Sequence, residues 1–259
     1  MTKRSYEILR MKDKFQSLKI KVPTIFDLPS RLLIVGKSEL SGKSNLIANL
    51  ILREKFYRKY FNPENIIIVC QSSSLDDKWK TMITELDIPD MNIIKRFNET
   101  KLEALYDLVK EEYIKATEEN KKPNHWLFIF DDVSYDGSLK SSTHGIVSKL
   151  FCNGRHLLIS TWITSQKYTD IPMVARENST GLILFSCTNK QIESIYEEHS
   201  LLNRKEFFKL YHDTTDEPYT FIVINYSNSK KERYMNSNFE PIDIDKYKKL
   251  NKFKPFQTF

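Results

Sequence analysis

The stretch RLLIVGKSELSGKSNLI, residues 31–47, limits the possible folds of this chain more than any other segment. An apolar run, a turn containing glycine, and an amphipathic stripe after Gly-Lys-Ser predict a strand, a loop and a helix. In phosphate-binding loops, four residues separate the first glycine from the Gly-Lys-Ser/Thr end. Here five residues separate Gly36 from Gly42. The segment therefore predicts a phosphate-binding loop with one additional residue, which we expect to form a bulge before Ser41.

The residue types in this loop are those that bind a nucleotide. Backbone N–H groups of such a loop, together with the dipole of the following helix, point at phosphate oxygens. The lysine is expected to reach the β- and γ-phosphates, and the serine after it to hold Mg²⁺ through its hydroxyl group. The predicted nucleotide-binding residues are Gly36, Ser41, Gly42, Lys43 and Ser44. An ordinary strand–turn–helix connection would leave the Ser-Gly-Lys-Ser run without an explanation.

A second motif of nucleotide hydrolysis is HWLFIFDDVSYDG. Its apolar run Trp126–Phe130 predicts a strand, and Asp131 and Asp132 follow directly. Acids in this position lie at the edge where open α/β sheets bind ligands. We expect Asp131 to serve the metal and Asp132 to orient or deprotonate the attacking water. Two acids after a strand are often only a polar turn, but their occurrence together with Lys43 favours a site for ATP and Mg²⁺.

Three more residues are candidates for the reaction. The segment GRHLLISTWITSQKYTDIP predicts a strand at Leu157–Thr161, with Gln166 beyond its polar end. The Gln166 amide is expected to contact the γ-phosphate or the water and to report hydrolysis. Arg155 and Arg176 are candidates for an arginine finger, which stabilises the transferring phosphoryl group, often from a neighbouring subunit. Taken alone, Gln166 is better interpreted as a loop cap, and each arginine as an ordinary surface residue.

The remaining pattern predicts an α/β fold with a mainly parallel sheet flanked by helices. Most strand candidates are continuous apolar runs, as expected for strands covered on both faces, and helical patterns lie between them. These candidates are Leu32–Val35, Ile66–Cys70, Trp126–Phe130, Leu157–Thr161, Leu182–Ser186 and Thr220–Asn225. The sequence contains no internal repeat and no low-complexity linker. We therefore expect one ATPase domain at residues 25–240.

Positive charge is concentrated at the two ends of the chain, in a basic arm at residues 1–24 and a basic tail at residues 241–259. Residues 1–21 and residues 246–259 each carry a charge of +5, whereas the whole chain carries +6. The body is therefore slightly acidic. Basic arms suit a polyanion such as DNA, and solvated tails are an equal alternative.

Composition also excludes several classes of protein. No apolar run reaches the roughly 18 residues of a membrane span, so we expect no transmembrane segment. The first residues lack the apolar stretch of a signal peptide. The three cysteines are far apart and the histidines form no cluster. This predicts reduced thiols in a cytosolic compartment, without a structural zinc.

Together the motifs resemble viral genome-packaging ATPases of the FtsK–HerA superfamily, and among them the poxvirus-like packaging ATPases of large double-stranded DNA viruses and virophages. The resemblance rests on SGKS with its preceding strand, HWLFIFDDV, NGRHLLISTWITSQ, IPMVARENS and YTFIVINYSNSKKERYMNSNF, in this order, over roughly residues 30–240. SGKS and the paired aspartates are shared with many ATPases. The Arg-His before the third strand, the glutamine after it and the Pro…Arg…Asn segment are more specific.

The resemblance implies a RecA-like P-loop core with an additional strand between the phosphate-loop strand and the double-acid strand. It also implies a homo-oligomeric ring, commonly a hexamer, that hydrolyses ATP to drive double-stranded DNA through its centre. Capsid or portal components are the implied partners, in the viral factory of the host cytoplasm or in the virion. Carried over position by position, the implied site residues are Lys43, Ser44, Asp131, Asp132, Gln166 and, as the arginine acting in trans, Arg176.

The chain departs from the family pattern in its first motif. Lys37 stands where a glycine is expected, and Leu40 where another glycine is frequent. These departures concern the geometry of the loop more than its existence. No segment clearly marks a central pore loop, and SYDGSLKSSTHG, residues 134–145, is only a candidate.

Several other functions were weighed against the motor. A large terminase subunit needs a nuclease domain, and we expect no second domain after residue 240. A GTPase needs Asn-Lys-x-Asp, but Ile192 stands where the aspartate belongs after Asn189 and Lys190. A nucleotide kinase would need an arginine-rich lid, which is not evident. A non-hydrolysing P-loop protein that binds DNA structurally stays open, as does another P-loop ATPase such as a DNA helicase or pump.

Overall fold

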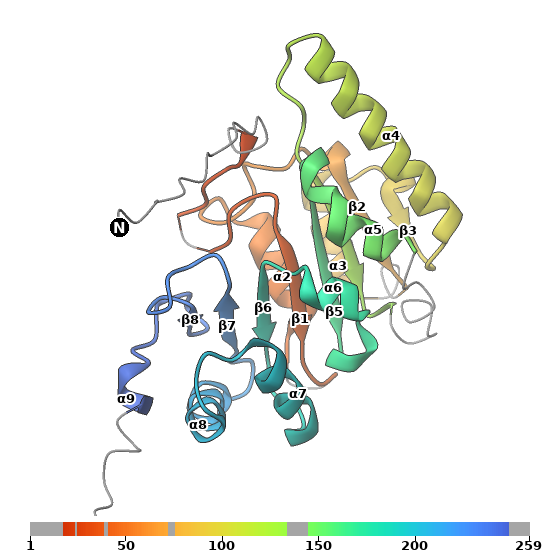
Figure 1. Ribbon diagram of the computed structural model, residues 1–259. Coiled ribbons are helices and arrows are strands. Elements are labelled where there is room, and N and C mark those ends of the chain that lie inside the picture. Colours follow the sequence, from red (N-terminus) through yellow and green to blue (C-terminus); the bar gives the residue numbers. More distant parts are fainter. Residues whose placement is uncertain (1–17, 24, 39–40, 72–75, 134–144, 249–259) are drawn as a thin grey trace, which may run out of the picture.

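The computed structural model describes residues 18–23, 25–38, 41–71, 76–133 and 145–248. This part of the chain forms one eight-stranded sheet with helices on both faces (Figure 1). The strands are β1 (Arg31–Val35), β2 (Ile66–Cys70), β3 (Ile93–Ile94), β4 (Trp126–Asp131), β5 (Ile159–Ser165), β6 (Gly181–Leu184), β7 (Ile222–Asn225) and β8 (Tyr234–Met235). The α-helices are α2 (Lys43–Leu52), α3 (Asp77–Leu86), α4 (Glu99–Glu118), α5 (Ile146–Asn153), α6 (Met173–Glu177), α7 (Asn189–His199), α8 (Arg204–Thr215) and α9 (Asp245–Lys248). Short 3-10 helices are η1 (Pro63–Asn65), η2 (Asp90–Asn92), η4 (Gly154–Leu157) and η5 (Tyr168–Asp170).

The strand order is β3-β2-β4-β5-β1-β6-β7-β8, and only the β6–β7 and β7–β8 pairs of this sheet are antiparallel. The mainly parallel α/β fold predicted from the apolar runs is therefore confirmed. β5 lies between β1 and β4, which is the additional strand implied by the family resemblance. Val35 pairs with Ser165 and Cys70 pairs with Asp131, so four central strands end at the same edge of the sheet.

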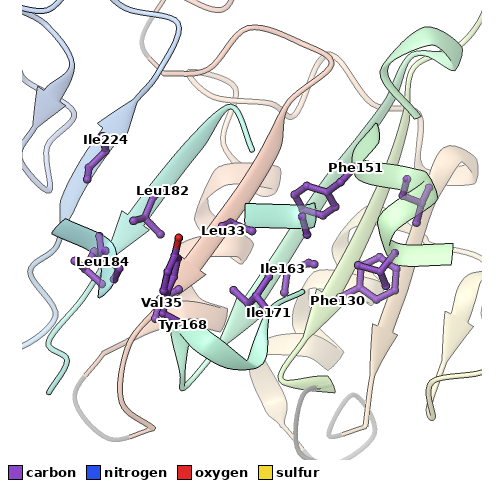
Figure 2. Close-up of a cluster of buried hydrophobic side chains, with 14 of the residues drawn as sticks. Leu33, Val35, Phe130, Phe151, Ile163, Tyr168, Ile171, Leu182, Leu184 and Ile224 are labelled. Atoms are coloured by element: carbon purple, nitrogen blue, oxygen red, sulfur yellow. The ribbon is translucent and has the colours of Figure 1, made fainter. Parts of the chain in front are cut away.

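The core lies in two layers, one on each face of the sheet. Alternate residues of a strand point to opposite faces, so Leu32 and Ile34 of β1 pack in the layer that includes α2 and α3. Leu33 and Val35 pack in the opposite layer with α4, α5, α7 and α8, and Figure 2 shows Phe151 of α5 in that layer. Burying each such side chain contributes about 1.5–3 kcal/mol. β1 is therefore held from both faces, which gives the following loop a rigid base.

The prediction for the fifth strand was wrong in its bounds. It was expected at Leu157–Thr161 but runs from Ile159 to Ser165, because η4 occupies residues 154–157 and Leu158 has a left-handed φ of 59°. The polar half of the segment is buried strand rather than a polar end. Ser160 Oγ accepts from the Ser30 amide at 3.0 Å and Thr164 bonds to the end of β4, whereas Thr161 Oγ1 is buried without a hydrogen-bond partner among the described residues. A search for apolar runs therefore finds only the first part of this strand.

Packed residues continue a few positions beyond both ends of the 25–240 segment. Val22 and Ile244 are buried in the two core layers, and Ile20 pairs with Leu28 in an isolated bridge. No helix among the described residues is long and apolar enough to cross a membrane. The described residues do not include most of the two basic extensions or residues 134–144 of the candidate pore loop. They also do not include residues 39–40, where the bulge was expected.

Candidate nucleotide-binding site

The loop after β1 is attached to the ends of both neighbouring strands. The Gly36 amide donates to the Ser165 carbonyl and the Lys37 amide donates to the Ser186 carbonyl, each at 3.1 Å. Gly36 also packs against Phe185 so closely that an added Cβ would lie 2.5 Å from the phenylalanine Cβ. Only glycine fits there, so the first glycine of the motif is required by packing at the mouth of the site.

At the other end of the loop, Gly42 has a φ of +77° and directly precedes α2. This left-handed conformation favours glycine and aims the first turn of the helix at the edge of the sheet. The ammonium group of Lys43 is buried and donates to the carbonyls of Gly36 and Lys37, at 2.8 and 3.0 Å. Burial lowers the pKa of Lys43, while the nearby Asp132 and Asp131 raise it. The lysine is therefore held inside the curve of the loop, facing the acids of β4.

Asp131 ends β4 inside a group of donors, only 4% exposed. Its Oδ1 accepts from the Thr164 hydroxyl at 2.6 Å, and its Oδ2 accepts from the Trp79 indole at 2.7 Å and from Ser44 Oγ at 3.1 Å. Burial raises the pKa of this carboxyl group, and the three donors lower it. The predicted metal residues Ser44 and Asp131 are thus brought into direct contact.

Asp132 follows in a left-handed conformation with a φ of 51°. Its amide donates to Thr164 Oγ1 at 2.9 Å, and its carboxylate Oδ2 accepts from Gln166 Nε2 at 2.6 Å. Thr164 thus bonds the carboxylate of Asp131 and the backbone amide of Asp132, while Gln166 holds the carboxylate of Asp132. Gln166 is therefore placed at the acid that was expected to activate water.

A model of the poxvirus A32 protein family matches residues 19–240. The chain belongs to this family. The family resemblance predicted from the motifs is thereby confirmed, over a range that contains the whole site. A curated relative, uncharacterized protein 075L of Invertebrate iridescent virus 6, is 28% identical over 204 residues. The match covers 76% of this A32-family chain and 71% of that relative.

Solved structures match the fold at low sequence identity. The genome packaging NTPase B204 of Sulfolobus turreted icosahedral virus 2, in complex with AMP, matches with a TM-score of 0.56 and 14% identity, covering 82% of this chain and 98% of B204. EssC (ATPases 2 and 3) from Geobacillus thermodenitrificans matches with a TM-score of 0.54 and 13% identity, covering 88% of this chain and 45% of EssC. These likenesses show that the A32-family chain has the fold of the packaging NTPase B204 and of the EssC ATPase domains.

The two candidate arginines lie apart from the phosphate loop within the chain. Arg155 is in η4, before β5 begins, and its Nε donates to the His156 ring at 3.2 Å. Arg176 is in α6, where it donates a hydrogen bond to Glu198. Its guanidinium carbon lies 4.9 Å from the centroid of the Tyr168 ring. Only 13% of the Arg176 side chain is exposed. The role of either arginine as a finger from a neighbouring subunit stays a prediction.

Two contacts of the acids were missing from the sequence-based site. Thr164 touches both acids, and Trp79 donates to Asp131 from the first turn of α3. The contact of Trp79 could have been predicted from its position in the chain, because α3 follows β2, and β2 pairs with β4. The first turn of a helix after a parallel strand lies at the edge where that strand ends. A polar-tipped tryptophan there is expected to reach a neighbouring acid.

The residues present fit Mg²⁺. Hydroxyl and carboxylate oxygens are the ligands this ion prefers, and it usually keeps several waters. Ser44 Oγ and the two carboxylate oxygens of Asp131 supply that donor set. The serine oxygen lies 3.4 Å from Asp131 Oδ1 and 3.1 Å from Asp131 Oδ2. Since both Asp131 oxygens already accept hydrogen bonds, the carboxylate suits contact with the ion through a bound water.

Proposed function

We propose that this A32-family chain is an ATPase that moves double-stranded viral DNA into the capsid during genome packaging. One observation carries the proposal: the side chains predicted to take part in hydrolysis lie at a single edge of the sheet. Lys43, Ser44 and Asp131 meet there, and Gln166 contacts Asp132. Family membership supports the viral context. The shared fold supports the nucleotide, because structures of B204 hold AMP and AMPPCP.

Each residue has a role that its position supports. Lys43 binds the β- and γ-phosphates, with the backbone N–H groups of Ser41 and Gly42 beside it. Ser44 and Asp131 hold Mg²⁺, which when bound neutralises charge on the β- and γ-phosphate oxygens. Asp132 aligns the attacking water and accepts its proton. Gln166 donates to Asp132 and so fixes the orientation of this carboxylate.

The assembly is proposed as a homo-oligomeric ring, with a hexamer as the number of subunits that the family resemblance implies, and with the nucleotide at a subunit interface. A neighbouring subunit then supplies an arginine, with Arg176 as the first candidate and Arg155 as the second. The ring encircles double-stranded DNA and docks on capsid or portal components, in the viral factory of the host cytoplasm or at the virion. DNA contacts mainly involve phosphates, so binding has little sequence preference and weakens with salt.

Steady-state ATP hydrolysis with and without long duplex DNA tests this function. We expect turnover by the full chain, and a higher rate when DNA is added, because DNA engagement and hydrolysis are coupled in a motor. Hydrolysis that ignores DNA would favour a pump or another ATPase. Binding of DNA and nucleotide without any hydrolysis would favour the non-hydrolysing structural protein, the alternative that the irregular loop suggests.

A further inference from the structure

A groove of about 320 Å³ opens beside the phosphate loop and shares Ser41 and Gly42 with it. This volume lies at the lower end of the roughly 300–1,000 Å³ typical of small-molecule sites. Four phenylalanines in continuous contact line it. The ring centroids are 4.9 Å apart for Phe185 and Phe221, 5.7 Å for Phe221 and Phe239, and 5.5 Å for Phe239 and Phe56. The groove therefore continues from the phosphate loop along an aromatic wall.

Polar side chains also line this groove. Asn45, in the first turn of α2, and Ser237 and Asn238, in the turn after β8, line the same groove. Amide and hydroxyl groups of this kind can bond the ring nitrogens and exocyclic groups of a flat heterocycle. Arg53 and Lys55 also line the groove, and their positive charge alone would suit a further phosphate. The continuous aromatic wall favours a nucleobase, because a flat ring can pack against it.

Tyr219 is the unusual residue of this groove. It is 62% exposed, although it is a large aromatic side chain. Its backbone has a left-handed φ of 66°, which is an outlier for a bulky residue and is found where surrounding structure and function require it. Its ring lies against the start of α2, 3.3 Å from where a Cβ on Gly42 would be. An exposed aromatic ring is thus held at the point where phosphate loop and groove meet.

We infer that this groove binds the base of the nucleotide, and that Tyr219 supplies the ring against which the base packs. The inference rests on the proposed function, because it assumes that phosphates bind at residues 41–44. Flat rings pack on aromatic side chains by stacking, which tolerates different bases. Tyr219 then contributes to affinity for the nucleoside part and has no role at the γ-phosphate.

Binding of ADP and of inorganic tripolyphosphate, which has no base, separates the two sites. Dissociation constants are measured for the full chain and for Tyr219→Ala, Tyr219→Phe and Lys43→Ala. The matched control is Tyr113→Ala, on α4. Tyr219→Ala is expected to weaken ADP binding about ten- to a hundred-fold, the loss typical of base–aromatic stacking. Tripolyphosphate binding is expected to stay unchanged, and Tyr219→Phe to bind ADP like the original chain.

Each other outcome overturns one of the two claims. Unchanged ADP binding in Tyr219→Ala, or an equal loss for ADP and tripolyphosphate, would overturn the base-binding role. If Lys43→Ala weakens neither ligand, the phosphate site itself is wrong, and the proposed function fails independently of Tyr219.

Discussion

Replacing Asp132 with asparagine is expected to lower ATP turnover by about 10²–10⁴-fold, the contribution typical of general acid–base catalysis. Asparagine keeps an oxygen that can accept the Gln166 hydrogen bond, but it cannot take a proton from water. It also tolerates the left-handed backbone at this position, where φ is 51°. The variant should therefore fold and bind nucleotide, and lose only the chemical step.

The measurement is the steady-state rate of ATP hydrolysis, with nucleotide binding followed in parallel. Asp87→Asn is a matched control, because Asp87 is an exposed aspartate at the end of α3 with a similar φ of 55°. We expect this control to hydrolyse ATP like the original chain. Turnover by Asp132→Asn close to the original rate would contradict the role given to Asp132. A loss of nucleotide binding in that variant would instead indicate a structural role.

Arg176→Ala is expected to lower turnover by ~10³-fold or more if Arg176 is the finger of a neighbouring subunit. Within its own chain the guanidinium group is paired with Glu198 and covers Tyr168. Acting in trans requires that this pair opens, or that the guanidinium contacts the next subunit while still paired. Glu198→Gln separates a finger from an internal structural pair, because it weakens the pair and leaves the arginine in place.

Turnover and melting temperature are measured for both variants. A finger predicts that only Arg176→Ala loses turnover, whereas an internal structural pair predicts lower melting temperatures for both and nearly normal turnover. A mixture of Arg176→Ala and Asp132→Asn subunits provides the second test. Activity should return in the mixture, because some interfaces then combine an intact Asp132 with an intact Arg176. No recovery would contradict action across the interface.

The sequence predicted those parts of the fold that depend on local pattern. β2 has the expected bounds, and α2 follows the expected apolar stripe, because buried parallel strands and amphipathic helices have distinct periods. On α4 the expected stripe is only partly right, because Leu102 and Val109 are buried but Leu108 is 52% exposed. β5 was misplaced because its buried hydroxyl groups resemble a loop in the sequence. The very short β3 and β8 were not predicted, since two residues give no period.

The site was predictable only as far as it follows motifs. Lys43 and the paired acids lie in segments that can be recognised by the spacing of their residues and by the apolar strand before them. The contacts of Trp79 and Thr164 depend on which strands become neighbours, which is a property of the topology. Tyr219 follows a polar segment, and only the antiparallel return of β7 brings it beside Gly42. Residues that complete a site from elsewhere in the chain leave no local pattern.

Displacement of a third DNA strand from a long duplex tests the central claim most directly. A protein that translocates along the duplex removes the third strand in an ATP-dependent reaction, whereas a protein that only binds DNA does not. We expect displacement by the full chain with ATP, and none by Asp132→Asn under the same conditions. Hydrolysis of ATP by the full chain without displacement of the third strand would contradict a DNA-translocating motor.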